Sequence, residues 1–398
     1  MKKFKLTLLV AGVLSALSAC SNTANNNLNK PQAALTSETA SATTQQLNSL
    51  VEQYFVDSLQ FSPLGATYIG YNQYNNQFTA PSTAQNRAQQ LAFYKDYQQR
   101  LAAIDQQQLT GQALLSYEIL ARDLALTIEG FQFPSYLLPI NQMSGAHNTF
   151  AGFGSAQSAQ PFANYQDYEN FVARAEGFVT WLSSVQDAMQ QGVNEGIVLP
   201  KPLAEKLLPQ FQAHIVTSAE QSLFYSPIKQ LPEQFTAAQK QQLTDQYSAL
   251  IMDKLVPAYT KMSEFLATTY IPNSRATVGY SDLPNGKAWY EYQIKKNTTL
   301  SLSADEIHEI GLKEVSRILN EMKKVKETVG FKGSLSEFFT HLRDSDEFYF
   351  DTPEQLIAAY EAVKLKIDAR VPKLFNIVPK ADYVVKAVED FRAESAAG

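Results

Sequence analysis

The chain has 398 residues, of which 45% are hydrophobic and 18% charged, and its formal net charge at pH 7 is −6. This length and composition exclude a disordered or collagen-like protein, and a single cysteine excludes a small domain held together by disulfides. The acidic balance argues against nucleic acid as a partner, because a negatively charged surface repels a phosphate backbone.

The first 19 residues show the three parts of a secretory signal peptide. Three lysines among the first five residues precede an apolar run over residues 6–14, which small residues follow. The run is too short to span a membrane. It leads to Leu17-Ser-Ala-Cys20, which resembles the lipobox of bacterial lipoproteins and implies that Cys20, the single cysteine, is lipidated. The alternative is an ordinary cleaved leader with an incidental cysteine.

Residues 20–45 are rich in Asn, Ser, Thr, Ala and Gln, with Lys30 and Glu38 as the charged side chains. Such a segment cannot bury enough apolar surface to offset its ordering entropy, so we expect a flexible tether. The resemblance to lipoproteins implies a lipid anchor in the bacterial cell envelope. Ser21 after the cysteine, in place of Asp, implies the outer membrane, with the protein facing the periplasm.

From residue 46 to residue 398 the pattern predicts one helical domain, because apolar residues recur at steps of three and four. We expect a mostly α protein: a large multi-helix array with long irregular loops and at most a minor β element, a strand over residues 383–388. The clearest apolar stripes are Phe171, Ala175, Phe178, Leu182, Val185 and Met189, and Ile307, Gly311, Val315, Ile318, Met322 and Val325. The predicted helices cover residues 47–59, 83–104, 110–129, 165–191, 201–220, 235–269, 303–330, 334–343 and 352–369.

Two segments interrupt this helical pattern and are expected to be irregular. Residues 130–166 contain no charged side chain but several prolines, glycines and aromatic residues. Residues 277–299 contain a turn signal followed by the aromatic cluster Trp289, Tyr290 and Tyr292. Long loops in a compact domain are often functional, so both segments are candidates for a substrate channel. The alternative is that both simply pack in the core.

No complete active site is visible in the residues themselves. A helical zinc peptidase needs two histidines four residues apart with a glutamate between them, and after His308-Glu309 the second ligand position holds Leu312. The four histidines are far apart in sequence, and neither a serine nucleophile elbow nor a phosphate-binding loop is present. We therefore assign no catalytic residue and no metal ligand. For His308, a position at the solvent edge of its helix is the alternative to a functional role.

Several stretches together resemble the bacterial lipoproteins of the domain-of-unknown-function 885 family. They are Ser62-Pro-Leu-Gly-Ala-Thr-Tyr-Ile-Gly70, Asn285-Gly-Lys-Ala-Trp-Tyr-Glu-Tyr292 and, most distinctively, Leu302-Ser-Ala-Asp-Glu-Ile-His-Glu-Ile-Gly-Leu-Lys-Glu-Val315. That family is similar to helical zinc-dependent metallopeptidases, and its zinc-binding helix lies downstream of the segment around His308. The resemblance implies zinc for the complete protein and no cofactor within this chain. The helical domain would then be incomplete at its C-terminus, as in a gene fragment.

Two classes of function remain open from the sequence. In the first, the chain is the N-terminal helical part of an envelope-anchored zinc peptidase, inactive alone, and Trp289, Tyr290, Tyr292 and His308 line the channel for a peptide substrate. In the second, it is a non-enzymatic helical lipoprotein that binds peptides or another envelope component in a groove. Whether the chain is an enzyme is left undecided by its residues, because an HExxH-type motif is absent.

Overall fold

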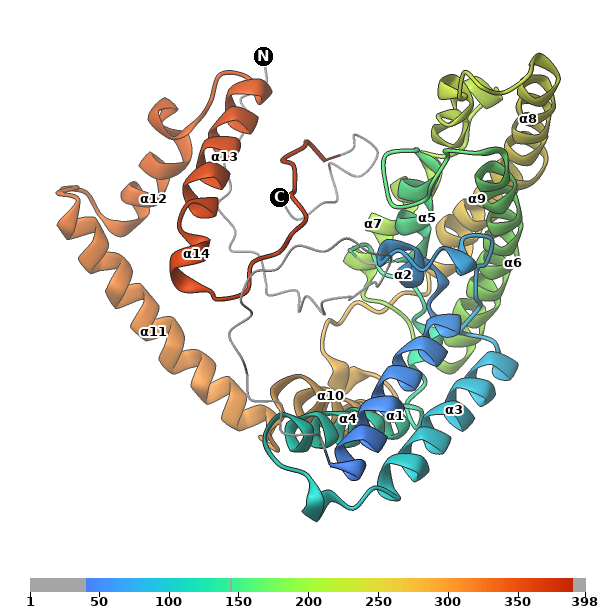
Figure 1. Ribbon diagram of the computed structural model, residues 1–398. Coiled ribbons are helices and arrows are strands. Elements are labelled where there is room, and N and C mark those ends of the chain that lie inside the picture. Colours follow the sequence, from blue (N-terminus) through green and yellow to red (C-terminus); the bar gives the residue numbers. More distant parts are fainter. Residues whose placement is uncertain (1–40, 144, 389–398) are drawn as a thin grey trace, which may run out of the picture. The chain divides into compact units, whose positions relative to one another are not determined.

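The computed structural model describes residues 41–143 and 145–388, shown as a ribbon in Figure 1. The predicted signal peptide over residues 1–19, the lipidation site Cys20 and residues 20–40 of the predicted tether lie outside the described residues. The last residues of the predicted tether, 41–45, are described and form the N-cap and first turn of α1 (Ala42–Ser58). Among those described, helices dominate and no strand is formed, which confirms the mostly α class. None of the described helices is long and apolar enough to cross a lipid bilayer. The described residues of the predicted domain over 46–398 fall into two compact units, 41–299 and 300–388.

The unit over residues 41–299 is built from helices, and the apolar periodicity predicted the positions of most of the long ones. Two π-helical segments, Leu250–Leu255 and Leu266–Tyr270, flank α9, so the helical run predicted over 235–269 is continuous. Its α-helices are α1 (Ala42–Ser58), α2 (Pro63–Tyr68), α3 (Ala84–Ala102), α4 (Gly111–Gly130), α5 (Ala146–Gly154), α6 (Tyr165–Glu195), α7 (Lys201–Gln212), α8 (Ala237–Ala249), α9 (Val256–Phe265) and α10 (Gly286–Thr298). Short 3-10 turns occupy Leu59–Phe61, Asn72–Tyr74, Gln106–Gln108, Ser135–Leu137, Ala219–Gln221, Leu223–Tyr225, Ile228–Gln230 and Tyr280–Asp282.

Helix α6 is the central element of this unit. It begins at a capping box in which the side chains of Asn164 and Asp167 accept each other's backbone N–H groups, and it ends at Gly196, whose φ of 72° suits glycine. All six residues of the predicted stripe from Phe171 to Met189 are buried. The stripe packs against α9 and the preceding π-helical segment. The prediction of a buried face on this helix is therefore confirmed.

A second part of the core lies where α1, α3 and α4 pack together. Leu47 and Leu50 of α1 meet Tyr97 and Leu101 of α3, and Leu124 of α4 is fully buried beside them. These positions are three or four residues apart on each helix, which is the spacing that places side chains on one face. The packing of α3 on α4 also positions the pocket described below, because both helices contribute residues to it.

Arg174 of α6 is a fully buried cation whose described hydrogen-bond partners are all neutral acceptors. Its guanidinium donates to the Gln77 carbonyl (3.1 Å), Gln160 Oε1 (2.5 Å), Thr67 Oγ1 (2.8 Å) and the Tyr74 carbonyl (2.5 Å). Burial lowers the pKa of Arg174 to about 10. The four bonds attach α2, the segment that follows it and the loop before α6 to the N-terminal half of α6.

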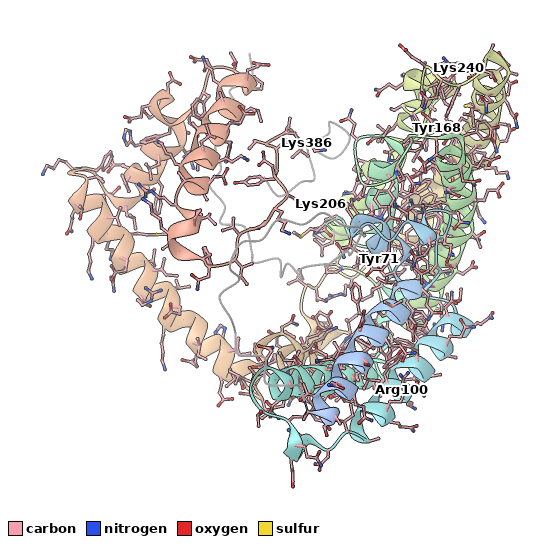
Figure 2. All side chains as sticks on the ribbon, in the orientation of Figure 1. Tyr71, Arg100, Tyr168, Lys206, Lys240 and Lys386 are labelled. Atoms are coloured by element: carbon pink, nitrogen blue, oxygen red, sulfur yellow. The ribbon has the colours of Figure 1, made fainter. Side chains whose placement is uncertain are left out.

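We predict that Arg174→Met lowers the free energy of unfolding by about 3 kcal/mol, because it removes four hydrogen bonds, two of them to the buried side chains of Thr67 and Gln160. Urea denaturation followed by circular dichroism measures this change. The matched control is Arg100→Met on α3, whose side chain is partly exposed at the surface of the unit (Figure 2) and pairs with Asp96 at 3.6 Å. That control should change the stability by less than about 1 kcal/mol. Equal losses in the two variants would contradict the structural role of Arg174.

Three details differ from the sequence prediction. The segments over 130–166 and 277–299, which were predicted to be irregular, contain helices α5 and α10. The sequence did not indicate these helices, because glycines, prolines and aromatic residues interrupt the apolar pattern there. Helix α7 ends at Gln212, earlier than predicted, and 3-10 turns follow it. The strand predicted over residues 383–388 is wrong, because that segment makes no ladder; the described residues contain one isolated bridge, between Pro200 and Arg275.

The unit over residues 300–388 has a much sparser core. Phe338 is its one buried side chain among the described residues, and Phe331 packs against it with ring centroids 5.2 Å apart. Most of the stripe predicted on α11 is exposed, with Val315 at 56% and Ile318 at 41%. Its helices are α11 (Ala304–Thr328), α12 (Leu335–Asp344), α13 (Pro353–Asp368) and α14 (Val371–Leu374), with a 3-10 turn over Asp346–Phe348.

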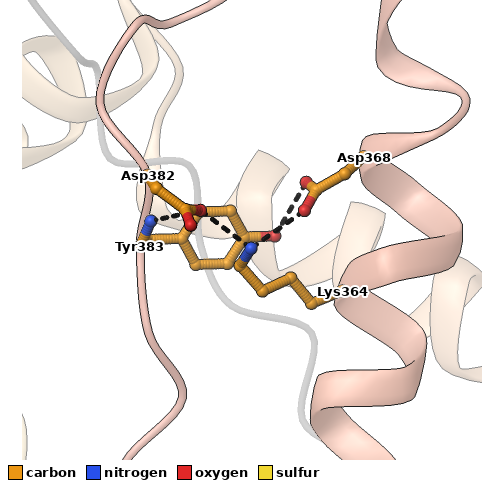
Figure 3. A network of polar contacts seen from close by, with 4 residues as sticks. All are labelled: Lys364, Asp368, Asp382 and Tyr383. Carbon is orange, nitrogen blue, oxygen red and sulfur yellow. Dashed lines mark hydrogen bonds and ion pairs between the residues drawn. The ribbon is translucent and has the colours of Figure 1, made fainter.

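A polar network attaches the extended C-terminal segment to α13 (Figure 3). Lys364 Nζ lies 3.0 Å from Asp368 Oδ2 and 2.8 Å from Asp382 Oδ1. Its ammonium also lies 4.5 Å from the centroid of the Tyr383 ring. Hydrogen bonds to the two carboxylates raise the pKa of Lys364. Side-chain bonds to α13 therefore take the place of the strand pairing that the sequence predicted here.

Candidate functional site

A pocket of about 410 Å³ lies in the unit over residues 41–299. Its walls come from residues 81–90 around the start of α3, residues 127–139 at the end of α4, Trp181 of α6, and α10. Both segments that interrupt the helical sequence pattern therefore contribute to one cavity. The aromatic residues in its wall are Phe131, Phe133, Tyr136, Trp181, Trp289 and Tyr292.

Phe133 organises the aromatic wall. Its ring stacks on Tyr292 at a centroid distance of 5.0 Å and on Trp289 at 6.0 Å. The Tyr280 ring meets the Trp289 ring edge-on, with the two ring centroids 5.3 Å apart. Stacked and edge-to-face pairs of this kind stabilise one arrangement of the rings beyond the effect of burial alone. Contacts within the protein thus hold the rings of this wall together.

Gly130, the last residue of α4, allows α10 to approach closely. A Cβ atom at this position would lie 2.3 Å from the Tyr292 hydroxyl oxygen, well inside van der Waals contact. That hydroxyl donates a hydrogen bond to the Leu126 carbonyl at 3.0 Å. Glycine is therefore required for Tyr292 to reach the end of α4 and close this side of the pocket.

Polar contacts hold the C-terminal end of α10 on α4. The guanidinium of Arg122 donates to the carbonyls of Lys295 (3.2 Å) and Lys296 (3.3 Å) in the last turn of α10, where helix carbonyls commonly lack a full set of backbone donors. The ammonium of Lys295 lies 2.7 Å from Glu129 Oε2. These contacts hold α10, which presents Tyr292, Gln293 and Lys296 to the pocket, in place on α4.

The charges at the pocket are all positive. Arg87 and Lys296 line it, and no Asp or Glu is among the described residues that do. The Arg87 guanidinium lies 3.4 Å from the centroid of the Tyr136 ring, and its Nη1 donates to the Ser82 carbonyl at 2.7 Å. Lys296 Nζ lies 6.0 Å from the Tyr292 ring centroid. The site therefore combines flat apolar walls with two cations.

The wall also contains a buried donor. Trp289 is 1% exposed, and its indole Nε1–H has no hydrogen-bond acceptor among the described residues. Such groups are uncommon in folded proteins because an unpaired buried donor costs about 1–3 kcal/mol. An acceptor atom of a water or a ligand would satisfy it.

The structure brings together some of the residues predicted from sequence. Trp289 and Tyr292 line the pocket, whereas Tyr290 points elsewhere and is 38% exposed. His308 is exposed on α11, in the unit over residues 300–388. The sequence did not single out Arg87, Trp181 or Lys296. One feature of the sequence could have drawn attention to this site: the chain has two tryptophans, and both line the pocket.

The described residues do not form a metal site. No group of three His, Cys, Asp or Glu side chains among them is arranged to hold a metal ion. Two of the four histidines do come together: His147 of α5 stacks on Phe211 at 4.8 Å, and His214 lies 4.7 Å from the Tyr259 ring centroid. The His147 Nε2 atom is 2.9 Å from Gln210 Oε1. Amide and aromatic neighbours of this kind form a buried core cluster, and zinc does not fit it.

Burial lowers the pKa of both histidines to about 4, and for His214 the nearby His147 adds to the effect. An unfolded chain would bind these protons near pH 6.5, so the unfolded state gains protons first as the pH falls. We predict that the free energy of unfolding falls between about pH 6.5 and pH 4, by about 3 kcal/mol per histidine. Urea denaturation across this interval measures the slope.

The variant His147→Gln should reduce that pH dependence, because one of the two titrating groups is gone. His308→Gln, which changes an exposed histidine, should leave the slope as it is. If His147→Gln and the unchanged protein have the same slope, the acid sensitivity comes from carboxylates instead.

The sequence was compared with models of protein families and with curated proteins. The sequence profile of DUF885, described as a bacterial protein of unknown function, matches residues 63–398. A search of the curated proteins gives no match.

Two similar solved structures are candidate lipoproteins. One, from Colwellia psychrerythraea, has a TM-score of 0.71 and 21% sequence identity, and the match covers 86% of this chain and 62% of the other. The second, of unknown function and from Shewanella oneidensis, has a TM-score of 0.53 and 16% identity, with 86% and 59% covered. The chain thus spans about three fifths of the length of each.

Proposed function

Because the chain belongs to the DUF885 family, whose function is unknown, we propose a role from the pocket itself: residues 41–299 bind an aromatic side chain of a peptide ligand. The observation that supports this role most directly is the aromatic wall in which Phe133 stacks on both Trp289 and Tyr292. Aromatic rings in such a wall offer large, rigid apolar area at a low entropic cost.

The size and polarity of the pocket suit one aromatic residue with its neighbouring peptide groups. A volume of about 410 Å³ lies within the range of small-ligand sites. Besides its aromatic residues, the wall contains side-chain amides and hydroxyls that can bond to main-chain N–H and C=O groups. These are Ser82, Gln90, Thr127, Ser135 and Gln293.

We further propose that this part of the protein holds a ligand and does not itself cleave it. The resemblance to zinc-dependent peptidases concerns the whole protein, and its zinc stays an expectation. The residues described here do not fit a zinc ion, and we assign no step of catalysis to them. Ligand binding is compatible with both classes of function that the sequence leaves open.

The first test compares N-acetyl-phenylalanine amide with N-acetyl-alanine amide. Since both tryptophans of the chain line the pocket, their fluorescence reports on its occupation. We expect the phenylalanine compound alone to change the emission in a saturable way. Phe133→Ala removes the central ring of the wall and should weaken binding about tenfold or more.

The matched control is Tyr290→Ala, which removes an exposed ring from the same helix that contributes Trp289 and Tyr292. It should leave the affinity unchanged. Equal weakening by the two substitutions, or equal binding of the two amides, would contradict an aromatic site at this pocket.

We also propose that the protein is lipid-anchored in the bacterial envelope, at the outer membrane. Two observations support this: the Leu17-Ser-Ala-Cys20 motif, and the description of both similar structures as candidate lipoproteins. Lipid on the cysteine would concentrate the pocket at a membrane surface.

Cys20→Ser removes the thiol that would receive the lipid. Expressed in a Gram-negative host, the unchanged chain should incorporate labelled fatty acid and sediment with the membranes. The variant should lose both properties. Ser21→Ala, which keeps the cysteine, is the control for expression, and fatty-acid incorporation into the Cys20→Ser chain would refute the assignment.

A further inference from the structure

We infer that the pocket selects a ligand that presents a carboxylate beside its aromatic ring, as the C-terminal aromatic residue of a peptide does. This inference rests on the proposed function and adds to it the charge of the ligand. It depends on two cations that line one cavity and lack an anionic partner, the Arg87 guanidinium and the Lys296 ammonium, and on the Trp289 indole, whose ring lines the cavity and whose N–H bonds to no described acceptor.

Arg87 is held in place but not neutralised. Stacking on Tyr136 and one bond from Nη1 to the Ser82 carbonyl fix the plane of its guanidinium. Within the described residues it forms no ion pair, and Nε and Nη2 make no hydrogen bond. A guanidinium fixed in this way can still donate two parallel bonds to a carboxylate, the geometry that this group prefers.

Several other cations of the unit differ from Arg87 in this respect, whereas exposed lysines such as Lys206 and Lys261 form no ion pair among the described residues either but do not line the pocket. Lys295, Lys254 and Arg100 each lie beside a carboxylate, and Arg174 spends its donors on four neutral acceptors. Lys296 is the neighbour of Lys295 on α10, yet it forms no ion pair among the described residues. Two uncompensated cations at one pocket, in a chain of net charge −6, favour an anionic ligand over a neutral one.

The buried indole of Trp289 is consistent with an acceptor on the ligand. Its N–H lies in the wall and bonds to no described atom. A carboxylate has two oxygens and about four acceptor positions, so it can take bonds from several donors at once. A neutral amide at the same place would bring an N–H group toward two cations, with one acceptor oxygen instead of two.

The test uses two probes with the same ring, N-acetyl-phenylalanine and N-acetyl-phenylalanine amide, titrated into the full chain and followed by tryptophan fluorescence. We expect the acid to bind about tenfold more tightly than the amide, because charge-assisted bonds are the stronger ones. Added salt should weaken binding of the acid more than that of the amide.

Two substitutions locate the source of the preference. Arg87→Gln and Lys296→Gln should each bring the affinity for the acid several-fold closer to that for the amide, with binding of the amide retained. Arg87→Lys keeps the positive charge but not the guanidinium that can donate two parallel bonds. It should therefore retain more of the preference for the acid than Arg87→Gln does. Lys296 is exposed, so its variant tests the inference even if Arg87→Gln disturbs the fold. Lys287→Gln, which removes an exposed charge from α10 outside the pocket, is the matched control and should change nothing.

The outcomes separate this inference from the function on which it rests. Equal affinity for acid and amide would overturn the inference and leave an aromatic pocket. Absence of binding by both would overturn the proposed function, and the inference with it. An equal effect of Lys287→Gln and Lys296→Gln would show that net charge, not this site, attracts the acid, and would also overturn the inference.

Discussion

The packing of α10 on the end of α4 is the constraint on which the pocket depends. It requires Gly130, since any Cβ there would collide with the Tyr292 hydroxyl, and it is reinforced by the bonds from Arg122 to the α10 carbonyls. Because Tyr292 then bonds to the Leu126 carbonyl, the ring that stacks on Phe133 has one position. The absence of a side chain at a single glycine thus lets two distant segments form a common wall.

Two arginines of the unit over residues 41–299, both at least partly removed from water, differ in how many of their N–H donors form hydrogen bonds. Arg174 is enclosed, and its buried charge is spread over neutral acceptors that join the segment after α2 to α6. Arg87 is half-buried and stacks on the Tyr136 ring, and some of its N–H donors make no hydrogen bond to the described residues. The first arrangement uses nearly all its hydrogen-bonding capacity for stability, whereas the second keeps that capacity for another molecule. This difference, more than the aromatic content, distinguishes the pocket from the rest of the core.

The unit over residues 300–388 follows a different physical pattern. Its longest described helix, α11, has 25 residues, but the apolar stripe from Val315 to Val325 on it is exposed. Helices in water gain most of their stability from packing an apolar face, so a stripe of this length is a surface that proteins normally cover. The described residues of this unit do not cover it. In contrast, the corresponding stripe on α6 is buried by α9 within its own unit.

The sequence predicted the long helices well because each depends on contacts repeated every three or four residues, as on α6. It failed at α5 and α10, where glycine, proline and aromatic residues indicate irregular structure until neighbouring helices supply the packing. It identified Trp289 and Tyr292 as functional candidates from aromatic clustering alone, but Tyr290 of the same cluster does not reach the pocket. Arg87 and Lys296 could not have been found, because an arginine and a lysine on two helix faces are ordinary in sequence. Only the long-range packing of α3, α4 and α10 makes them neighbours of one cavity and leaves them without a carboxylate.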